Sequence, residues 1–178
     1  MVQYIFLNAL NQTQAFGPQK MFLLLKFFGC NAKQAWYARS SELMAAGLDQ
    51  SSIEKFLDKR KDVDPEREWK SIEQEGISLI VHPDLEKMDS NNSISRAFAY
   101  PKLLTHIAVS PPILYVKGVL EDNSIPKIAV VGSRKVSPYG TSVTKDIVYQ
   151  LAFHCEVIIV SGLALGVDTI AHESSLKA

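Results

Sequence analysis

Two apolar runs decide the fold of this chain: KIAVVG at Lys127–Gly132 and EVIIVSG at Glu156–Gly162. Each run is continuous and rich in β-branched residues, which is typical of parallel strands buried on both faces. Ser137-Pro138 predicts a helix between them, because serine caps helix N-termini and proline suits the first turn. A second helix is predicted to open at Asp168-Thr169. The order β-α-β-α therefore predicts an α/β fold with the opening part of a right-handed, Rossmann-like parallel sheet.

Both predicted strands end in a glycine-bearing loop, and both loops fall at the carboxyl edge of the sheet, where open α/β folds bind their ligands. Gly132 and Gly162 let the backbone approach a ligand closely, because glycine carries no Cβ. Ser133 and Ser161 offer hydroxyl donors to a phosphate oxygen. The N-termini of the helices that follow add partial positive charge. The matched pair of loops predicts a phosphate-binding site.

Two cations in the first loop strengthen this prediction. Arg134 supplies a planar fork of donors that suits two oxygens of one phosphate, and Lys135 adds a second charge beside it. The predicted phosphate-binding residues are Gly132, Ser133, Arg134, Lys135, Ser161, Gly162 and Gly166. The alternative is that the glycines only form strand-to-helix turns and that Arg134 is solvated. No metal site and no cofactor is expected, because no cysteines or histidines are paired at ligand spacing.

The same loops argue against several classes of enzyme. Neither matches G-x-G-x-x-G and neither is a Walker lysine loop, which disfavours NAD and nucleoside triphosphates as ligands. Asp168 and His172 lie four residues apart on one helix face and could form an acid/base pair. We favour a structural role, in which Asp168 caps the helix and His172 packs beside it. No nucleophile has an adjacent base, so we predict that the protein is not an enzyme.

The composition is that of an ordinary globular protein: 47% of the 178 residues are hydrophobic, and 19 basic residues balance 19 acidic ones. A protein that binds nucleic acid usually shows a basic excess, so any such binding here must be local. Cys30 and Cys155 are expected to be buried, reduced thiols. The N-terminus lacks a basic leader, and no apolar run reaches the roughly 20 residues of a membrane span. We therefore predict a cytoplasmic protein with no membrane contact.

The N-terminal third predicts short helices, because apolar residues recur at helical spacing over residues 2–62. The turn Phe16–Lys20 resembles that of a helix-hairpin-helix motif, in which exposed backbone N–H groups meet a DNA phosphate. A plain turn between two packed helices explains it equally well. Asp64-Pro65 predicts the start of another helix. We assign residues 1–75 to a helical domain and residues 76–178 to a second domain.

The segment between the helices and the parallel unit is less regular. ISLIVH at residues 77–82 and ILYVKG at residues 113–118 are short apolar runs typical of strands. The second of them is expected to add a strand to the sheet that follows. Residues 85–98 are rich in Ser and Asn and lack periodicity, which indicates a loop or insertion. The chain ends at Ala178 inside a predicted helix, so we expect a fragment with unpaired apolar edges.

Short motifs recur in a defined order from residue 100 to residue 172. They are Tyr100-Pro101, Leu103-Leu104, Pro111-Pro112, Leu114-Tyr115, Gly118, Val130–Arg134, Tyr139-Gly140, Ser161–Ala164, Gly166, Asp168, Ala171 and His172. In these motifs the chain closely resembles the DprA (Smf) family of DNA-processing proteins of bacterial natural transformation. The helical region before them resembles that family's N-terminal domain, which is of the sterile-alpha-motif-like, helix-hairpin-helix type.

The resemblance implies a recombination mediator without catalytic turnover. It implies binding of single-stranded DNA, protection of incoming strands and loading of RecA onto them, and a homodimer for the full-length protein. It also transfers roles to individual residues of the two glycine loops. The residues that would line the DNA pocket are Gly132, Ser133, Arg134, Ser161, Gly162 and Gly166.

Two other functions stay open. A nucleotide phosphoribohydrolase of the lysine-decarboxylase-like family has a related sheet and phosphate loop, and the fold alone does not exclude it. The helical N-terminal domain and the Tyr100-Pro101 motif disfavour it. In the remaining interpretation, the helical domain is a protein-interaction module followed by a degenerate α/β tail.

Overall fold

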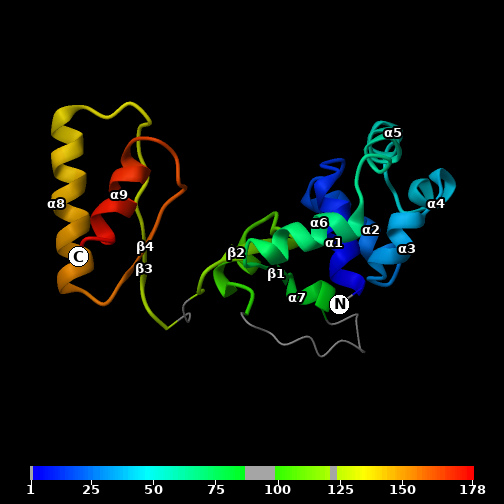
Figure 1. Cartoon of the computed structure of the whole chain (residues 1–178), viewed down its shortest axis with the longest axis horizontal. Helices are drawn as coiled ribbons and strands as arrows, with labels where there is room; N and C mark the ends of the chain where they lie inside the picture. The colour runs from blue at the N-terminus through cyan, green and yellow to red at the C-terminus, as the bar shows by residue number, and fades with distance from the viewer. Residues whose placement is uncertain (1, 87–98, 121–123) are drawn as a thin grey trace. The chain divides into compact units, whose positions relative to one another are not determined.

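The chain forms two compact units, Met1–Leu120 and Glu121–Ala178 (Figure 1). The structure is a computed structural model that describes residues 2–86, 99–120 and 124–178.

The boundary between the two units falls after residue 120 of the sequence, whereas the sequence analysis suggested a domain boundary between residues 75 and 76. The difference arises because the connector strands pair with each other and join the apolar core of the helices. Independent folding of residues 1–75 stays a prediction. Most of the predicted 85–98 loop, residues 87–98, lies outside the described residues.

Short α-helices make up most of the described part of the first unit, as the helical spacing predicted. They are α1 (Val2–Gln12), α2 (Pro18–Phe27), α3 (Ala32–Tyr37), α4 (Ser40–Ala45), α5 (Gln50–Lys59) and α6 (Pro65–Gln74). The side chains of Asn31, Asp49 and Asp64 cap α3, α5 and α6 by accepting backbone N–H bonds. The predicted start of a helix at Asp64-Pro65 is therefore confirmed.

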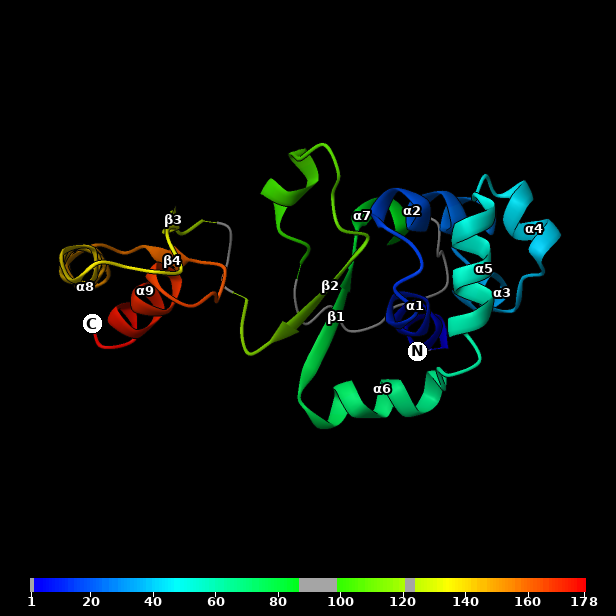
Figure 2. The same cartoon turned by 90° about the horizontal axis from the view of Figure 1, so that it is seen from above.

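The connector strands form an antiparallel pair in the first unit (Figure 2). They are β1 (Ile77–Val81) and β2 (Ile113–Lys117), and α7 (Pro83–Glu86) and a 3-10 helix (Lys102–His106) lie between them in sequence. The expectation that the second strand extends the following sheet was wrong, since β2 pairs with β1. The physical reason is burial: Val81 and Ile113 lie opposite each other and both belong to the core of the helices.

The first unit has a closed apolar core. Phe56 is fully buried, and its ring packs against Phe16 and Trp36 with centroid distances of 5.0 and 5.7 Å. The other large apolar side chains of this unit with almost no exposed surface are Leu10, Met21, Leu24, Leu25, Leu43 and Ile53. Because they come from α1, α2, α4 and α5, these helices hold one another in place.

A partly buried polar contact ties β2 to α1. The Tyr115 hydroxyl donates to Oδ1 of Asn8 (2.8 Å) and accepts from Nδ2 of Asn11 (3.1 Å). Asn8 is fully buried, so the contact satisfies an amide oxygen that would otherwise cost stability. Burial raises the pKa of Tyr115 above its ordinary value, and the hydrogen bond from Asn11 opposes that rise.

The second unit has the predicted β-α-β-α order. Its elements are β3 (Lys127–Ala129), α8 (Pro138–His154), β4 (Ile158–Val160) and α9 (Val167–Ser175). β3 and β4 are parallel neighbours, with Ala129 opposite Val160. Ser137 caps α8 by accepting the N–H of Gly140 at 3.1 Å, as predicted. The α/β fold class with its opening Rossmann-like segment is confirmed.

The core of the second unit is thin. Among its described residues, only Val148 and Ala171 are buried apolar side chains. α8 packs against α9, and both helices contact β4. Large apolar side chains left exposed include Val131, Ile147, Phe153, Val160, Leu163, Leu165 and Leu176. Cys155 is exposed as well, contrary to the prediction, because it lies at the C-cap of α8 and not on its packed face; Cys30 is buried as expected.

Candidate phosphate-binding site

The two predicted loops lie side by side at the carboxyl ends of β3 and β4 (Figure 1). The N–H of Val130 donates to the carbonyl oxygen of Val160 (2.9 Å), and the Ser161 hydroxyl donates to the carbonyl oxygen of Val130 (2.7 Å). At the start of α9, the N–H of Val167 donates to the carbonyl oxygen of Ser133 (3.2 Å). These bonds join the β3–α8 loop (residues 130–137) to the β4–α9 loop (residues 161–166) as one surface.

Glycine is required where these loops touch. Gly166 has a φ of 91°, and a Cβ there would lie 2.3 Å from the carbonyl oxygen of Ser133. A Cβ on Gly132 would lie 2.7 Å from Cγ2 of Val167. We expected Gly132 to allow the close approach of a ligand and Gly166 to belong to the phosphate site; in the structure, both glycines allow one loop to pack against the other.

Asp168 holds the second loop in shape. Its carboxylate, on a residue only 7% exposed, accepts the N–H groups of Gly162 (3.1 Å) and Ala164 (3.4 Å). We expected Asp168 to cap α9 and to open that helix, but α9 begins at Val167, and the carboxylate turns back to the preceding loop. Its engagement with backbone N–H groups is as predicted.

His172 does not complete an acid/base pair in the described part of the chain. No hydrogen bond or ion pair joins it to Asp168, and its Nε2 is buried without a partner among the described residues. The described residues also contain no cluster of three side chains able to hold a metal ion. Within the described residues, Asp168 and His172 are therefore not arranged as an acid/base pair.

The two predicted serine donors are engaged within the loops. The Ser133 hydroxyl donates to the carbonyl oxygen of Lys135 (2.8 Å) and accepts the N–H of Lys135 (3.1 Å). Ser161 donates to Val130, as described above. Both hydroxyls thus shape the backbone of the site, and a phosphate contact from either one would require its hydroxyl proton to rotate away from a carbonyl oxygen.

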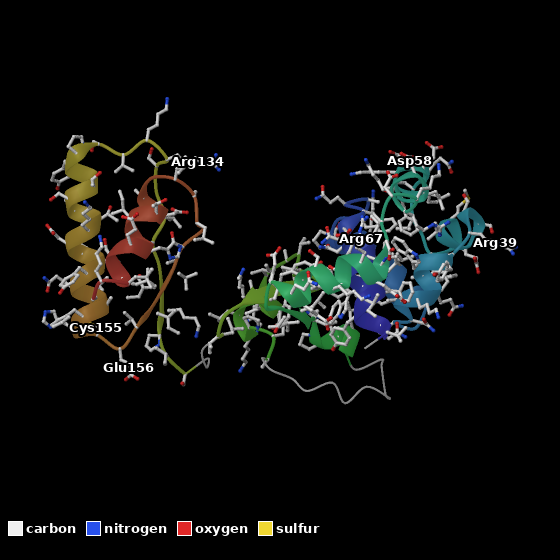
Figure 3. The ribbon with its side chains drawn as sticks, viewed as in Figure 1. Arg39, Asp58, Arg67, Arg134, Cys155 and Glu156 are labelled. Atoms are coloured by element: carbon white, nitrogen blue, oxygen red, sulfur yellow. The ribbon has the colours of Figure 1, made fainter. Side chains whose placement is uncertain are left out.

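Arg134 and Lys135 are the available charges of the site. Both are exposed, and neither side chain has a hydrogen-bonding or ion-pair partner among the described residues. Figure 3 shows Arg134 on the loop between β3 and α8, whereas Cys155 and Glu156 lie at the opposite end of the unit. The only acidic side chain within residues 130–137 and 161–168 is the buried Asp168, so this edge carries a local positive charge.

The sequence reasoning gave no role to two leucines in the second loop, although Leu163 lies within the Ser161–Ala164 motif. Leu163 has a φ of 56°, which is uncommon for a residue with a Cβ, and its side chain is 83% exposed. Leu165 is 77% exposed. Tyr139, at the start of α8, is a third exposed apolar side chain near this edge. The alternation of leucine with small residues in a loop without helical or strand spacing was the signal that could have found them.

Comparison with known proteins identifies related sequences. Residues 93–178 match the model of the family described as DNA recombination-mediator protein A. The chain is 29% identical over 174 residues to protein Smf of Synechocystis, covering 95% of this chain and 40% of that protein. It is 42% identical over 78 residues to the DNA processing protein DprA of Streptococcus pneumoniae, covering 44% of this chain and 27% of that protein.

A solved structure shares the fold. The crystal structure of DNA processing protein A from Streptococcus pneumoniae matches 98% of this chain with a TM-score of 0.60 and 25% sequence identity, and the match covers 52% of that protein. The chain spans less than half the length of the curated relatives named above. In the part of the chain that the structure describes, no helix combines the length and the apolar character needed to cross a bilayer.

Proposed function

Because this chain belongs to the DprA (Smf) family of DNA-processing proteins, we propose that its β3–α8 and β4–α9 loops bind the phosphate backbone of single-stranded DNA. The observation that supports this proposal best is the pair of exposed cations at the joined loops, Arg134 and Lys135, with no partner among the described residues. Cations without an internal partner, at the sheet edge where α/β folds bind ligands, are suited to an external anion.

Each loop residue has its own part in this proposal. Arg134 holds one phosphate through its guanidinium fork, and Lys135 adds charge beside it. Gly132 and Gly166 keep the two loops together, and Ser133 shapes the backbone that carries the arginine. Ser161 and Gly162 keep the second loop in place, because the Ser161 hydroxyl donates to the carbonyl oxygen of Val130 and the N–H of Gly162 donates to Asp168.

The wider activity follows from the family resemblance. We propose that the protein is a recombination mediator that protects incoming single strands and loads RecA onto them during natural transformation, in the cytoplasm and as a homodimer in its full-length form. We also propose that it acts without catalytic turnover. The engagement of the Asp168 carboxylate by two backbone N–H groups supports this, because a general base needs a free carboxylate.

The test of the phosphate site is Arg134→Ala in the 178-residue chain. A charge-assisted contact contributes about 1.5–3 kcal/mol, so affinity for oligo-dT should fall roughly 10- to 100-fold. The slope of log K against log salt concentration should become shallower by about 0.7. The affinity for a mixed-sequence strand should fall by as much as the affinity for oligo-dT. Arg134→Lys should recover part of the affinity, because lysine keeps the charge and loses the fork. Fluorescence anisotropy across a salt series measures all three effects.

Lys145→Ala is the matched control. Lys145 is an exposed cation in the middle of α8, so its loss removes the same unit charge from the same unit away from the loops. The affinity of the Lys145→Ala variant for oligo-dT should stay within about twofold of that of the parent chain. Equal behaviour of the Arg134 and Lys145 variants would mean that the β3–α8 loop is structural and that our site assignment is wrong.

The hydrolase alternative has its own test. Nucleoside monophosphates incubated with the protein should release no free base. Release of base that is abolished by Asp168→Asn would replace the mediator proposal with the phosphoribohydrolase.

A further inference from the structure

We propose that Leu163 and Leu165 form an apolar rim that packs against unstacked bases, and that this rim makes the site prefer single strands over duplexes. The inference rests on the proposed function, since it assigns the base-contacting part of the same site. It concerns side chains to which neither the sequence motifs nor the comparisons give a role.

The leucines are held outward by the backbone on either side of them. Gly162 and Ala164 donate their N–H groups to Asp168, and the carbonyl oxygen of Ala164 accepts both the N–H (3.1 Å) and the hydroxyl (2.7 Å) of Thr169. The intervening Leu163 is left in the left-handed region, which is an unfavourable conformation for a residue with a Cβ. Its side chain does not compensate for this conformation by packing, because it is almost fully exposed.

The rim adjoins the proposed phosphate contact. Gly166 follows Leu165 directly, and a Cβ on Gly166 would lie 2.8 Å from Cα of Arg134. The backbone that carries the leucines is therefore in van der Waals contact with the backbone that carries the cation. One surface presents an anion-binding group and, next to it, two exposed apolar side chains.

A single strand matches this pairing of charge and apolar surface. Each nucleotide has a phosphate and a flat base, and in a single strand the base face is free to pack against a protein side chain. In a duplex the base faces are stacked on one another, and the protein meets mainly phosphates and groove edges. The cation should thus serve both forms of DNA, whereas the leucines should serve only the single strand.

The decisive variant is the double substitution Leu163→Ser, Leu165→Ser in the 178-residue chain. Anisotropy with a fluorescent oligo-dT and with a duplex of equal length should show a loss of about 5- to 20-fold for the single strand and less than twofold for the duplex. The salt slope should stay unchanged, because no phosphate contact is removed. Arg134→Ala behaves differently in the same assay, since it weakens both forms and lowers the slope.

Two further variants keep the test independent of misfolding. Leu176→Ser makes the same chemical change at an 86% exposed leucine at the C-cap of α9, about 15 Å along the helix from Gly166, and should leave binding unchanged. Leu165→Phe should tighten single-strand binding, because an aromatic ring stacks on a base better than leucine does. A misfolded protein would not gain affinity.

The outcomes separate the two proposals. If the double serine variant keeps its preference for single strands while Arg134→Ala still loses affinity, the apolar rim is overturned and the phosphate site stands. If the parent chain binds no DNA and instead binds vesicles of anionic phospholipid through the leucines, both proposals fail and the rim is a membrane contact. Loss of single-strand affinity alone, with the slope intact, supports the rim.

Discussion

The two units of this protein use the same kinds of side chain to different ends. In the first unit, helices from different parts of the sequence meet around Phe56 and bury a closed core. In the second unit, two parallel strands and two helices bury little beyond Val148 and Ala171, and leave large apolar side chains exposed. The contrast indicates that short helices joined by tight turns can complete a core within one unit, whereas a parallel sheet needs many strands and helices to cover both faces.

The basic side chains named here also differ between the units, since Lys20 and Arg60 of the first unit have partners within it and Arg134 of the second unit has none among the described residues. In the first unit, Lys20 pairs with Asp49 (2.5 Å), and Arg60 donates to the carbonyl oxygens of Trp36 (2.6 Å) and Ala38 (3.1 Å). Lys20 belongs to the turn that resembled a helix-hairpin-helix motif, and both interpretations of that turn stay predictions. In the second unit, Arg134 has no partner among the described residues and is available to a ligand.

The largest expected effect comes from separating the units. Residues 1–120 expressed alone should melt cooperatively, because their core is closed, and residues 121–178 alone should aggregate or form swapped oligomers. Circular dichroism and size-exclusion chromatography measure both. A monomeric, cooperatively melting 121–178 fragment would contradict this expectation, because it would show that the second core is sufficient by itself.

Phe56→Ala should destabilise the first unit by about 3–5 kcal/mol, because it empties a fully buried site between Phe16 and Trp36. Both tryptophans of the chain, Trp36 and Trp69, lie in the first unit, so tryptophan fluorescence during urea unfolding reports on that unit alone. The exposed Phe27→Ala is the control and should cost less than about 1 kcal/mol. Equal costs would show that the core is looser than its burial indicates.

Tyr115→Phe should cost about 1–3 kcal/mol, because it leaves the buried Oδ1 of Asn8 without its donor. Burial raises the folded pKa of Tyr115, so its neutral form stabilises the fold fully below the unfolded pKa of about 10, and this stability is lost as the pH rises through the folded pKa. Urea unfolding at pH 7 and at alkaline pH measures both effects. Tyr37→Phe, at an exposed tyrosine, should change neither the stability at pH 7 nor the loss of stability at alkaline pH.

The smallest effect is expected at Asp49. Hydrogen bonds from Lys20 first, and then from Ser52, hold the pKa of this carboxyl well below its usual range. The ionised form therefore stabilises the fold above the unfolded pKa of about 3.9, and this contribution is lost as the pH falls through the folded pKa. Asp49→Asn should make the acid-induced loss of stability shallower, as followed by thermal melts from pH 7 to pH 2. Asp58→Asn, at an exposed carboxylate, should leave the profile unchanged.

Local chemistry was enough to predict most elements of the fold. Helical spacing, the cap at Asp64 and the Ser137-Pro138 start each describe a few neighbouring residues, and the structure confirms them. The parallel order of β3 and β4 was also predictable, because two apolar runs joined by one helix have essentially one right-handed arrangement. The strand β2 was different, since its apolar pattern fits either an antiparallel partner or an extension of the later sheet.

In the candidate site, too, the local features were predictable from the sequence and the contacts between distant segments were not. The order of residues was enough to predict which side chains stand at the ends of β3 and β4, including the glycines and Arg134, because strand direction places both loops at one edge. Three features became visible only in the folded unit: Gly166 packs against the Ser133 carbonyl, Asp168 turns back to the loop, and two leucines of that loop are exposed. The physical reason is that spacing along the chain specifies local geometry, whereas contacts between distant segments depend on which surfaces pack together most closely.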